Sequence, residues 1–270
     1  MTRPTALAAT AATLTLLATF VSTVSAKEHF GHEDWGEVLA ARVDDQGLVD
    51  YAGLAADRAA LDRTVATVAA RSPATHPRLF PTRDHELAYY LNAYNALAIH
   101  GVLDLDPEVE SVWKGGLVSG YRFFVKRKVV VGGKKTNLRK LENEVIRKRY
   151  RDPRIHVALN CASAGCPRLP RTPFVAETLD ERLDALTRDF VTDDRHVRVD
   201  VTARRVSLSK IFDWFREDFI DTKRGGAGGT LLDWVNLHRP PEQRIPTDFA
   251  VDFLPYDKRL NRQVSARGER

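Results

Sequence analysis

The stretch 86–101 constrains the fold more than any other, because nearly every side of its helical wheel is apolar or aromatic. A helix that is apolar all round is a buried one, so the stretch predicts a helix in the centre of a globular domain. It carries two amides, Asn92 and Asn95, three residues apart and therefore neighbours on the helix surface. A buried amide without partners costs about 1–3 kcal/mol. These side chains either tie down neighbouring loops or line a polar site, and the sequence favours neither.

Helical and extended patterns elsewhere predict an α+β fold, a single helix-rich domain around a small, mainly antiparallel sheet. Further helices are expected over 35–42, 54–70, 138–149, 175–191, 210–219 and 231–238, and strands over 121–131, 155–160 and 249–254, with a hairpin over 196–207. Asn137 and Ser209 are the expected N-caps of two of these helices. The chain has 270 residues and only 2 cysteines, so it can bury a core without a framework of disulfides.

Residues 1–26 have the pattern of a secretory signal. Arg3 supplies a positive charge, 6–21 is mostly apolar, and Val24-Ser25-Ala26 ends in small residues. The apolar run is rich in alanine and threonine, so we expect cleavage rather than a retained anchor. The sequence then predicts an exported protein, periplasmic or secreted, with its domain at 27–262 and a disordered tail at 263–270. Charges interrupt the later apolar runs, so no membrane span is expected after cleavage.

The formal net charge is +5, with acidic and basic residues alternating along most of the chain. Nucleic acid is a poor partner for an exported protein, so we interpret the basic run at 126–135 as a solvated hairpin face. The expected partner is an unknown small molecule or peptide. The glycine loop at 224–230 lacks P-loop spacing, and no cofactor is predicted. His29 and His32 could bind a metal, but we interpret them as part of a frayed N-terminus, and no metal is predicted.

Most of the reactive side chains lie in the stretch 154–168, which holds His156 and both cysteines, Cys161 and Cys166. If 155–160 is a strand, successive side chains alternate between its faces. His156 and Cys161 would then point in opposite directions, whereas Cys166 could fold back toward the histidine. The small residues at 162–165 make that folding easy and leave backbone N–H groups free to bind an anion.

Three interpretations of the cysteines remain open. The first is a structural disulfide, Cys161–Cys166, which an oxidising compartment favours. The second is a thiol nucleophile with His156 as base and Glu142, Asn92 or Asn95 as orienting groups, acting in acyl transfer or amide hydrolysis on cell-wall or surface peptides. The third is a redox pair, which the spacing favours least.

A hypothesis of a different class has no catalysis. The domain would be a ligand-binding or interaction module with a disulfide-fixed loop beside a polar pocket. The candidate ligand-binding residues are Asn92, Asn95, Asn160 and Arg154, with His156 beside them. The state of the two sulfurs separates the hypotheses, because a bridge removes the nucleophile.

Five motifs occur in order: Tyr90–Leu97, Leu138–Arg147 with Glu142, Arg154–Pro167, Leu208–Phe215 and Leu254–Asp257. Together they resemble the family called domain of unknown function 547, found in bacteria and plants. The resemblance covers about residues 35 to 262, and it implies one domain but no established reaction. Plant relatives keep an equivalent of Cys161 and carry serine in place of Cys166, so the resemblance implies that Cys161 is the more general residue. Asn143 stands where bacterial relatives often have histidine.

Overall fold

The computed structural model describes residues 29–105, 109–113 and 120–264. The expected signal, 1–26, and most of the expected tail lie outside these residues. The helices and strands are α1 (Glu33–Arg42), α2 (Tyr51–Ala56), α3 (Ala59–Ala70), η1 (Pro77–Leu79), α4 (Arg83–Leu103), η2 (Arg122–Lys126), β1 (Val129–Val131), β2 (Lys134–Thr136), α6 (Leu138–Lys140), η3 (Leu141–Arg147), α7 (Lys148–Tyr150), α8 (Ile155–Ala158), η4 (Ala176–Thr178), α9 (Leu179–Thr192), β3 (Val197–Asp200), β4 (Arg205–Leu208), α10 (Lys210–Trp214), α11 (Arg216–Ile220), η5 (Thr222–Arg224), α12 (Leu231–His238), η6 (Pro241–Gln243) and β5 (Ala250–Phe253).

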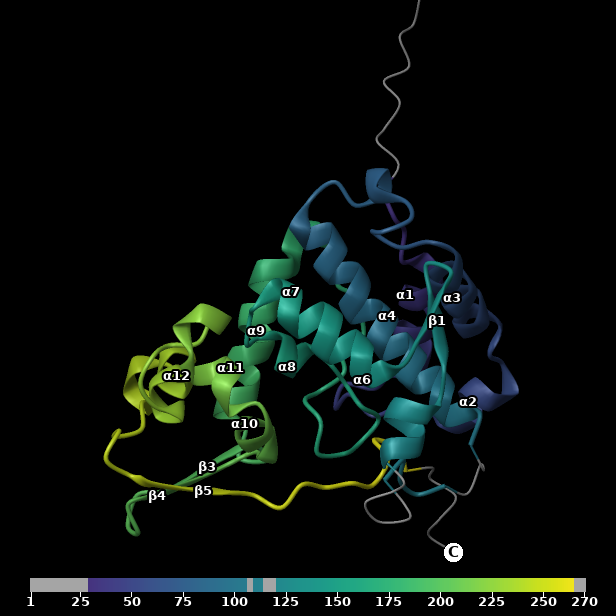
Figure 1. Cartoon of the computed structure of the whole chain (residues 1–270). Coiled ribbons are helices and arrows are strands. Elements are labelled where there is room, and N and C mark those ends of the chain that lie inside the picture. The colour runs from purple at the N-terminus through teal and green to yellow at the C-terminus, as the bar shows by residue number, and fades with distance from the viewer. Residues whose placement is uncertain (1–28, 106–108, 114–119, 265–270) are drawn as a thin grey trace, which may run out of the picture.

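Helix α4 is the central element, as the sequence predicts (Figure 1). Thr82 caps it by accepting a hydrogen bond from the His85 N–H, and the residues from Leu87 to Ile99 are all buried. Around it pack the helices α1–α3 and the composite helix 138–150, and these form the larger of two buried clusters. Within the residues that the structure describes, no helix is both long enough and apolar enough to span a bilayer.

The second cluster lies around α10–α12 and a three-stranded sheet. Strand β3 pairs antiparallel with β4, as the expected hairpin requires, and β5 adds to β4 in parallel. The strands β1 and β2 form a separate antiparallel hairpin. The described chain is therefore α+β, with small sheets and mainly helical structure. Leu186 of α9 packs against both clusters.

The strand expected over 155–160 is wrong, and the strand expected over 121–131 is present only at its end, as β1. Residues 155–158 form the single helical turn α8, and residues 122–126 form a π-helical turn. The turn α8 begins where Asp152 accepts the N–H of Arg154 at its side chain and that of Ile155 at its carbonyl. Every residue of 155–160 is buried, so its side chains do not alternate between a buried face and an exposed face. An apolar run this short cannot distinguish a buried helical turn from a strand.

The helix expected at 138–149 is present, with the Asn137 side chain accepting the Lys140 N–H as its cap. Its middle, η3, is π-helical. Such a stretch adds a residue to the turn and is frequent at functional sites, because it re-aims the side chains that it carries. The helix expected at 54–70 is interrupted, with α2 ending at Ala56 and α3 beginning at Ala59.

The C-terminal segment runs across the molecule after β5 (Figure 1). Leu260 bridges to Ser163, and Arg262 bridges to Val49 near the start of the chain. Gln263 donates from its side chain to the carbonyls of Arg42 and Leu48. This segment therefore connects the three-stranded sheet, the loop 161–166 that carries both cysteines (the cysteine loop) and the N-terminal helices.

Candidate functional site

A pocket of about 510 Å³ lies between the two clusters, and both cysteines line it. We call it the thiol pocket. Its walls are largely aromatic, with Trp113, Phe124, Trp214 and Phe215 among them. Trp214 of α10 is 45% exposed. Its ring is therefore accessible at the pocket rather than enclosed in the core.

The two cysteines are free thiols. Their sulfurs lie 2.8 Å apart, which is longer than the ~2.05 Å of a disulfide bond, so the expected disulfide is not present. The Tyr256 hydroxyl lies 3.1 Å from the Cys161 sulfur and 3.2 Å from the Cys166 sulfur. The pair is therefore held by hydrogen bonds, with the tyrosine as their common partner. Cys166 is buried, whereas Cys161 is partly exposed to the pocket.

The surroundings make the two sulfurs unequal. The hydrogen bond with Cys166 lowers the pKa of the Cys161 thiol, burial opposes this, and the Tyr256 hydroxyl and Ser163 add to the lowering. Burial raises the pKa of the Cys166 thiol, and the neighbouring Cys161 raises it further. Cys161 is thus both the more acidic and the more accessible thiol, which are the two properties of a nucleophilic cysteine.

His156 also lines the pocket, but its Nε2 atom is hydrogen-bonded to the Asp218 carboxylate at 2.8 Å. Its ring stacks on Phe215 with centroids 4.1 Å apart. Burial lowers the pKa of His156, which Asp218 opposes. Burial disfavours the ionised form of Asp218, but hydrogen bonds from His156 and Arg147 outweigh this and hold the pKa of its carboxyl well below the usual range. This Nε2 atom is directed at a carboxylate rather than at a thiol.

Glu142 lies in the π-helical stretch and faces the pocket. Its carboxylate accepts a hydrogen bond of 3.3 Å from the Tyr94 hydroxyl, which reaches it from α4. Burial raises the pKa of Glu142 to about 7, while Arg147 and Tyr94 oppose the rise. A carboxyl group with this pKa can donate or accept a proton near neutral pH, as general acid–base catalysis requires.

The asparagines bind backbone outside the pocket. Asn95 donates to the carbonyl of Ala158 and accepts from the N–H of Asn160. Asn160 in turn accepts from Ala162 and donates to the Pro167 carbonyl. These amides hold both ends of the cysteine loop, which is the loop-fixing role considered for the buried helix.

The other two candidates also lie elsewhere. Asn92 donates to the carbonyl of Phe174 and accepts from its N–H. Arg154 binds three carboxylates, those of Asp152, Asp180 and Asp184. Neither residue lines the thiol pocket.

Most N–H groups of the cysteine loop are already used. The N–H of Cys161 donates to the Cys166 sulfur, and those of 162, 164, 165 and 166 donate to oxygen atoms of the protein. The expectation that residues 162–165 leave N–H groups free for an anion therefore fails at 162, 164 and 165. Glycine at position 165 lets the Tyr256 ring lie against the backbone of the loop, since a Cβ there would lie 2.9 Å from the ring.

The residues missed by sequence reasoning are aromatic. Tyr256 and Tyr94 were seen only as parts of motifs, although each contacts a titratable group of the pocket. The signal for Tyr256 was the motif Leu254–Asp257, which stands outside any regular apolar pattern. Its position beside the cysteines depends on the path of the C-terminal segment, which no local pattern encodes.

The fold and the pocket define an α+β domain with a pair of free thiols at an aromatic pocket. Residues 79–191 match the family described as "Protein of unknown function, DUF547". The match contains Glu142, His156 and both cysteines, and it supports the resemblance carried by the motifs. Trp214 and Tyr256, which complete the pocket, lie beyond the matched segment. Neither the curated proteins nor the solved structures gave a significant match.

Proposed function

We propose that the protein is an exported thiol-dependent hydrolase or acyltransferase with Cys161 as its nucleophile. The observation that carries the proposal is the pair of free sulfurs 2.8 Å apart, both in contact with the Tyr256 hydroxyl, in an open pocket. Hydrogen bonds to a sulfur favour its thiolate, and the thiolate is the reactive form. Export rests on the signal pattern of residues 1–26.

The residues present support a reaction in two steps, acylation of Cys161 and then transfer of the acyl group to water or an amine. The Cys161 thiolate attacks an acyl carbonyl, a C–S bond forms, and the C–N or C–O bond to the leaving group breaks. The Glu142 carboxyl gives its proton to the leaving group. Water or a second amine then attacks the thioester, Glu142 takes back a proton, and the thiolate leaves. Tyr256, released from the sulfur when the C–S bond forms, can donate to the carbonyl oxygen as charge develops there.

The pocket favours a substrate with an apolar or aromatic acyl side and a nearby carboxylate. Trp113, Trp214 and Phe215 supply flat apolar surface, and Arg139 supplies positive charge on the same lining. Its volume of about 510 Å³ lies within the range of sites for small ligands. Peptides of the cell wall or cell surface have this chemistry and are accessible to an exported protein.

Acyl-enzyme trapping tests the proposal. The reduced protein is mixed with p-nitrophenyl phenylacetate, release of nitrophenol is followed, and the quenched protein is digested for mass spectrometry. We expect a burst of nitrophenol and a phenylacetyl group on Cys161. Cys161→Ser should lose both, while Cys166→Ser should retain an acylated Cys161. Equal bursts from the wild type and Cys161→Ser would overturn the proposal.

The aromatic walls also favour a second candidate, a ligand-binding module without chemistry. Binding of a small aromatic carboxylate would quench the fluorescence of Trp214, and this quenching would persist in Cys161→Ser. Quenching without acylation in the wild type would favour the module. Counting thiols by alkylation of the denatured, unreduced protein shows in addition whether the isolated protein carries a bridge.

A further inference from the structure

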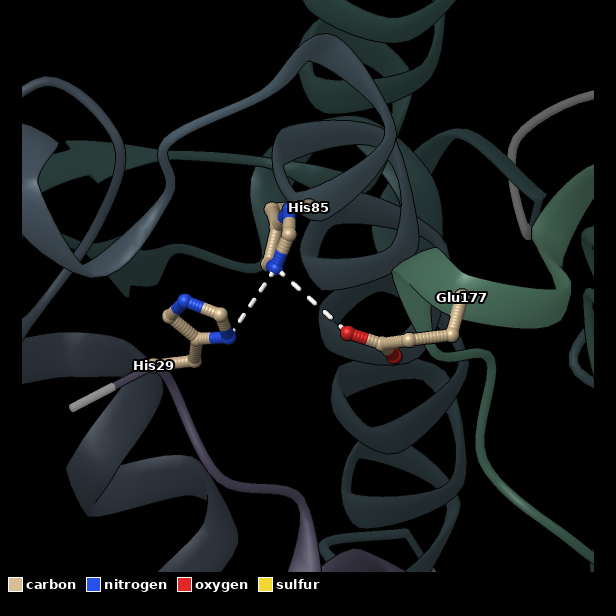
Figure 2. Close-up of side chains that lie close together, drawn as sticks. All are labelled: His29, His85 and Glu177. Atoms are coloured by element: carbon tan, nitrogen blue, oxygen red, sulfur yellow. Dashed lines mark hydrogen bonds and ion pairs between the residues drawn. The ribbon is translucent and has the colours of Figure 1, made fainter. Parts of the chain in front are cut away.

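Three side chains of types that bind metal ions come from distant parts of the chain and lie close together outside the thiol pocket (Figure 2). They are His29, which precedes α1, His85 in the first turn of α4, and Glu177 in η4. One ligand atom from each lies within 4.8 Å of the other two. We propose that these three residues form a binding site for a divalent transition-metal ion, with zinc as the preferred ion.

Two of the three ligand distances fit a shared ion, and the exposed Glu177 side chain can move to close the third. His85 Nε2 lies 3.3 Å from His29 Nδ1 and 3.7 Å from Glu177 Oε1. In a tetrahedral zinc site with Zn–N bonds of about 2.0–2.1 Å, two ligand nitrogens lie roughly 3.3–3.4 Å apart. Figure 2 shows the two ring nitrogens and the carboxylate oxygen turned toward one another. A cation between them lets both imidazoles present lone pairs that would otherwise repel.

The ligands are also held in place. The Thr82 hydroxyl lies 2.7 Å from His85 Nδ1, the ring atom that does not face the site. With an ion on Nε2, the Nδ1–H donates to this oxygen, and metal-ligating histidines almost always have such an outer partner. The segment carrying His29 is held by the N–H of Phe30, which donates to the Leu79 carbonyl at 3.2 Å, and by stacking of Phe30 on Phe80.

The third ligand is placed by the buried helix. Asn92 holds both backbone groups of Phe174, and η4 begins shortly after, at Ala176. The carboxylate of Glu177 is 65% exposed, which gives an ion a route from solvent. Two neutral imidazoles and one carboxylate, without thiolate, are a donor set typical of zinc with an open fourth position.

His32, the partner that its spacing suggested for His29, has a different role. Its Nε2 atom lies 3.3 Å from the Asn92 amide nitrogen, and burial lowers its pKa to about 4. The ion would therefore connect elements far apart in sequence rather than two histidines on one helix start. The ion would thus fix the segment before α1 to α4 and to η4.

Titration of the chelator-stripped, untagged protein with zinc chloride tests the site by calorimetry and thermal unfolding. We expect one zinc ion per chain and a rise in Tm. His29→Ala and His85→Ala should each weaken binding at least about 100-fold, and Glu177→Gln about tenfold. His76→Ala and Glu181→Gln, which change exposed residues of the same types elsewhere, should bind as the wild type does.

The cysteine pair is the competing zinc ligand, so the titration is repeated on Cys161→Ser/Cys166→Ser. Binding unchanged in this variant and lost in His85→Ala supports the proposal. Binding lost with the cysteines, a thiolate-to-metal band with cobalt, or zinc affinity unaltered in the doubly substituted His29→Ala/His85→Ala protein overturns it. Absence of zinc binding to the folded wild type, verified by circular dichroism, leaves a plain His85–Glu177 ion pair and also overturns it.

Discussion

Replacing Glu142 with glutamine should remove a loss of stability that the wild type suffers as the pH rises. Burial raises the pKa of Glu142 from 4.5 to about 7. Between these values the folded protein holds a proton that the unfolded chain has released, so the free energy of unfolding falls with rising pH. Glutamine resembles the protonated form and does not ionise, so the variant lacks this fall.

The magnitude follows from the two pKa values. A difference of one pH unit corresponds to about 1.4 kcal/mol, which gives an upper limit of about 3 kcal/mol for Glu142. Water at the open pocket screens part of this, so we expect ~1–3 kcal/mol. Relative to the wild type, Glu142→Gln should thus change from near equality at acidic pH to a gain of this size at mildly alkaline pH.

Urea unfolding followed by tryptophan fluorescence, at a series of pH values in a reducing buffer, measures this difference. Other titrating groups contribute to both proteins and cancel in the comparison. Glu144→Gln is the matched control, because Glu144 is exposed on the same helix. Its difference from the wild type should not depend on pH. A pH-independent difference for Glu142→Gln as well would refute the argument that burial raises this pKa.

Three further outcomes are expected. Asp218→Asn should destabilise the protein by about 3–5 kcal/mol in urea unfolding, because it leaves Arg147 and the buried His156 without their carboxylate partner. The pKa of the Asp218 carboxyl is depressed, so its contribution to the stability of the wild type should fade as the pH falls below the usual aspartate range. Tyr256→Phe should slow iodoacetamide alkylation of Cys161 roughly tenfold at neutral pH and move its pH profile upward, since a hydrogen bond to a charged group contributes about 1.5 kcal/mol or more; an unchanged profile would mean that the tyrosine does not favour the thiolate. Asn95→Ala should cost about 2–4 kcal/mol by thermal unfolding, because it strands two buried backbone groups, and a cost below about 0.5 kcal/mol would contradict the loop-fixing role.

Sequence reasoning succeeded where local chemistry determines the structure. The buried α4, the β3–β4 hairpin and the caps at Asn137 and Ser209 all depend on residues within a few positions of each other. It failed at α8, because a buried apolar run this short does not distinguish a helical turn from a strand. The error had a consequence for the site, because the assumed strand separated His156 from Cys161, whereas both line one pocket.

The parts of the site that could not be predicted depend on distant contacts. Tyr256 is 95 residues from Cys161, and Asp218 is 62 residues from His156. Nothing in the local sequence of 154–168 indicates a tyrosine beside the sulfurs or a carboxylate beside the imidazole. The same holds for His29 and Glu177, whose meeting with His85 depends on how three elements pack.

The path of the C-terminal segment also sets the order in which the protein can be assembled. A chain made from its N-terminus has produced Cys161 and Cys166 long before Tyr256, and the hydrogen bond from Tyr51 to Asn261 spans 210 residues. Contacts of such long range form late, because closing a long loop costs entropy before any contact compensates for it. During synthesis the thiols therefore lack the Tyr256 hydroxyl group, which adds to the lowering of the Cys161 pKa that the hydrogen bond with Cys166 begins. The complete set of hydrogen bonds around the Cys161 sulfur is therefore a property of the finished chain.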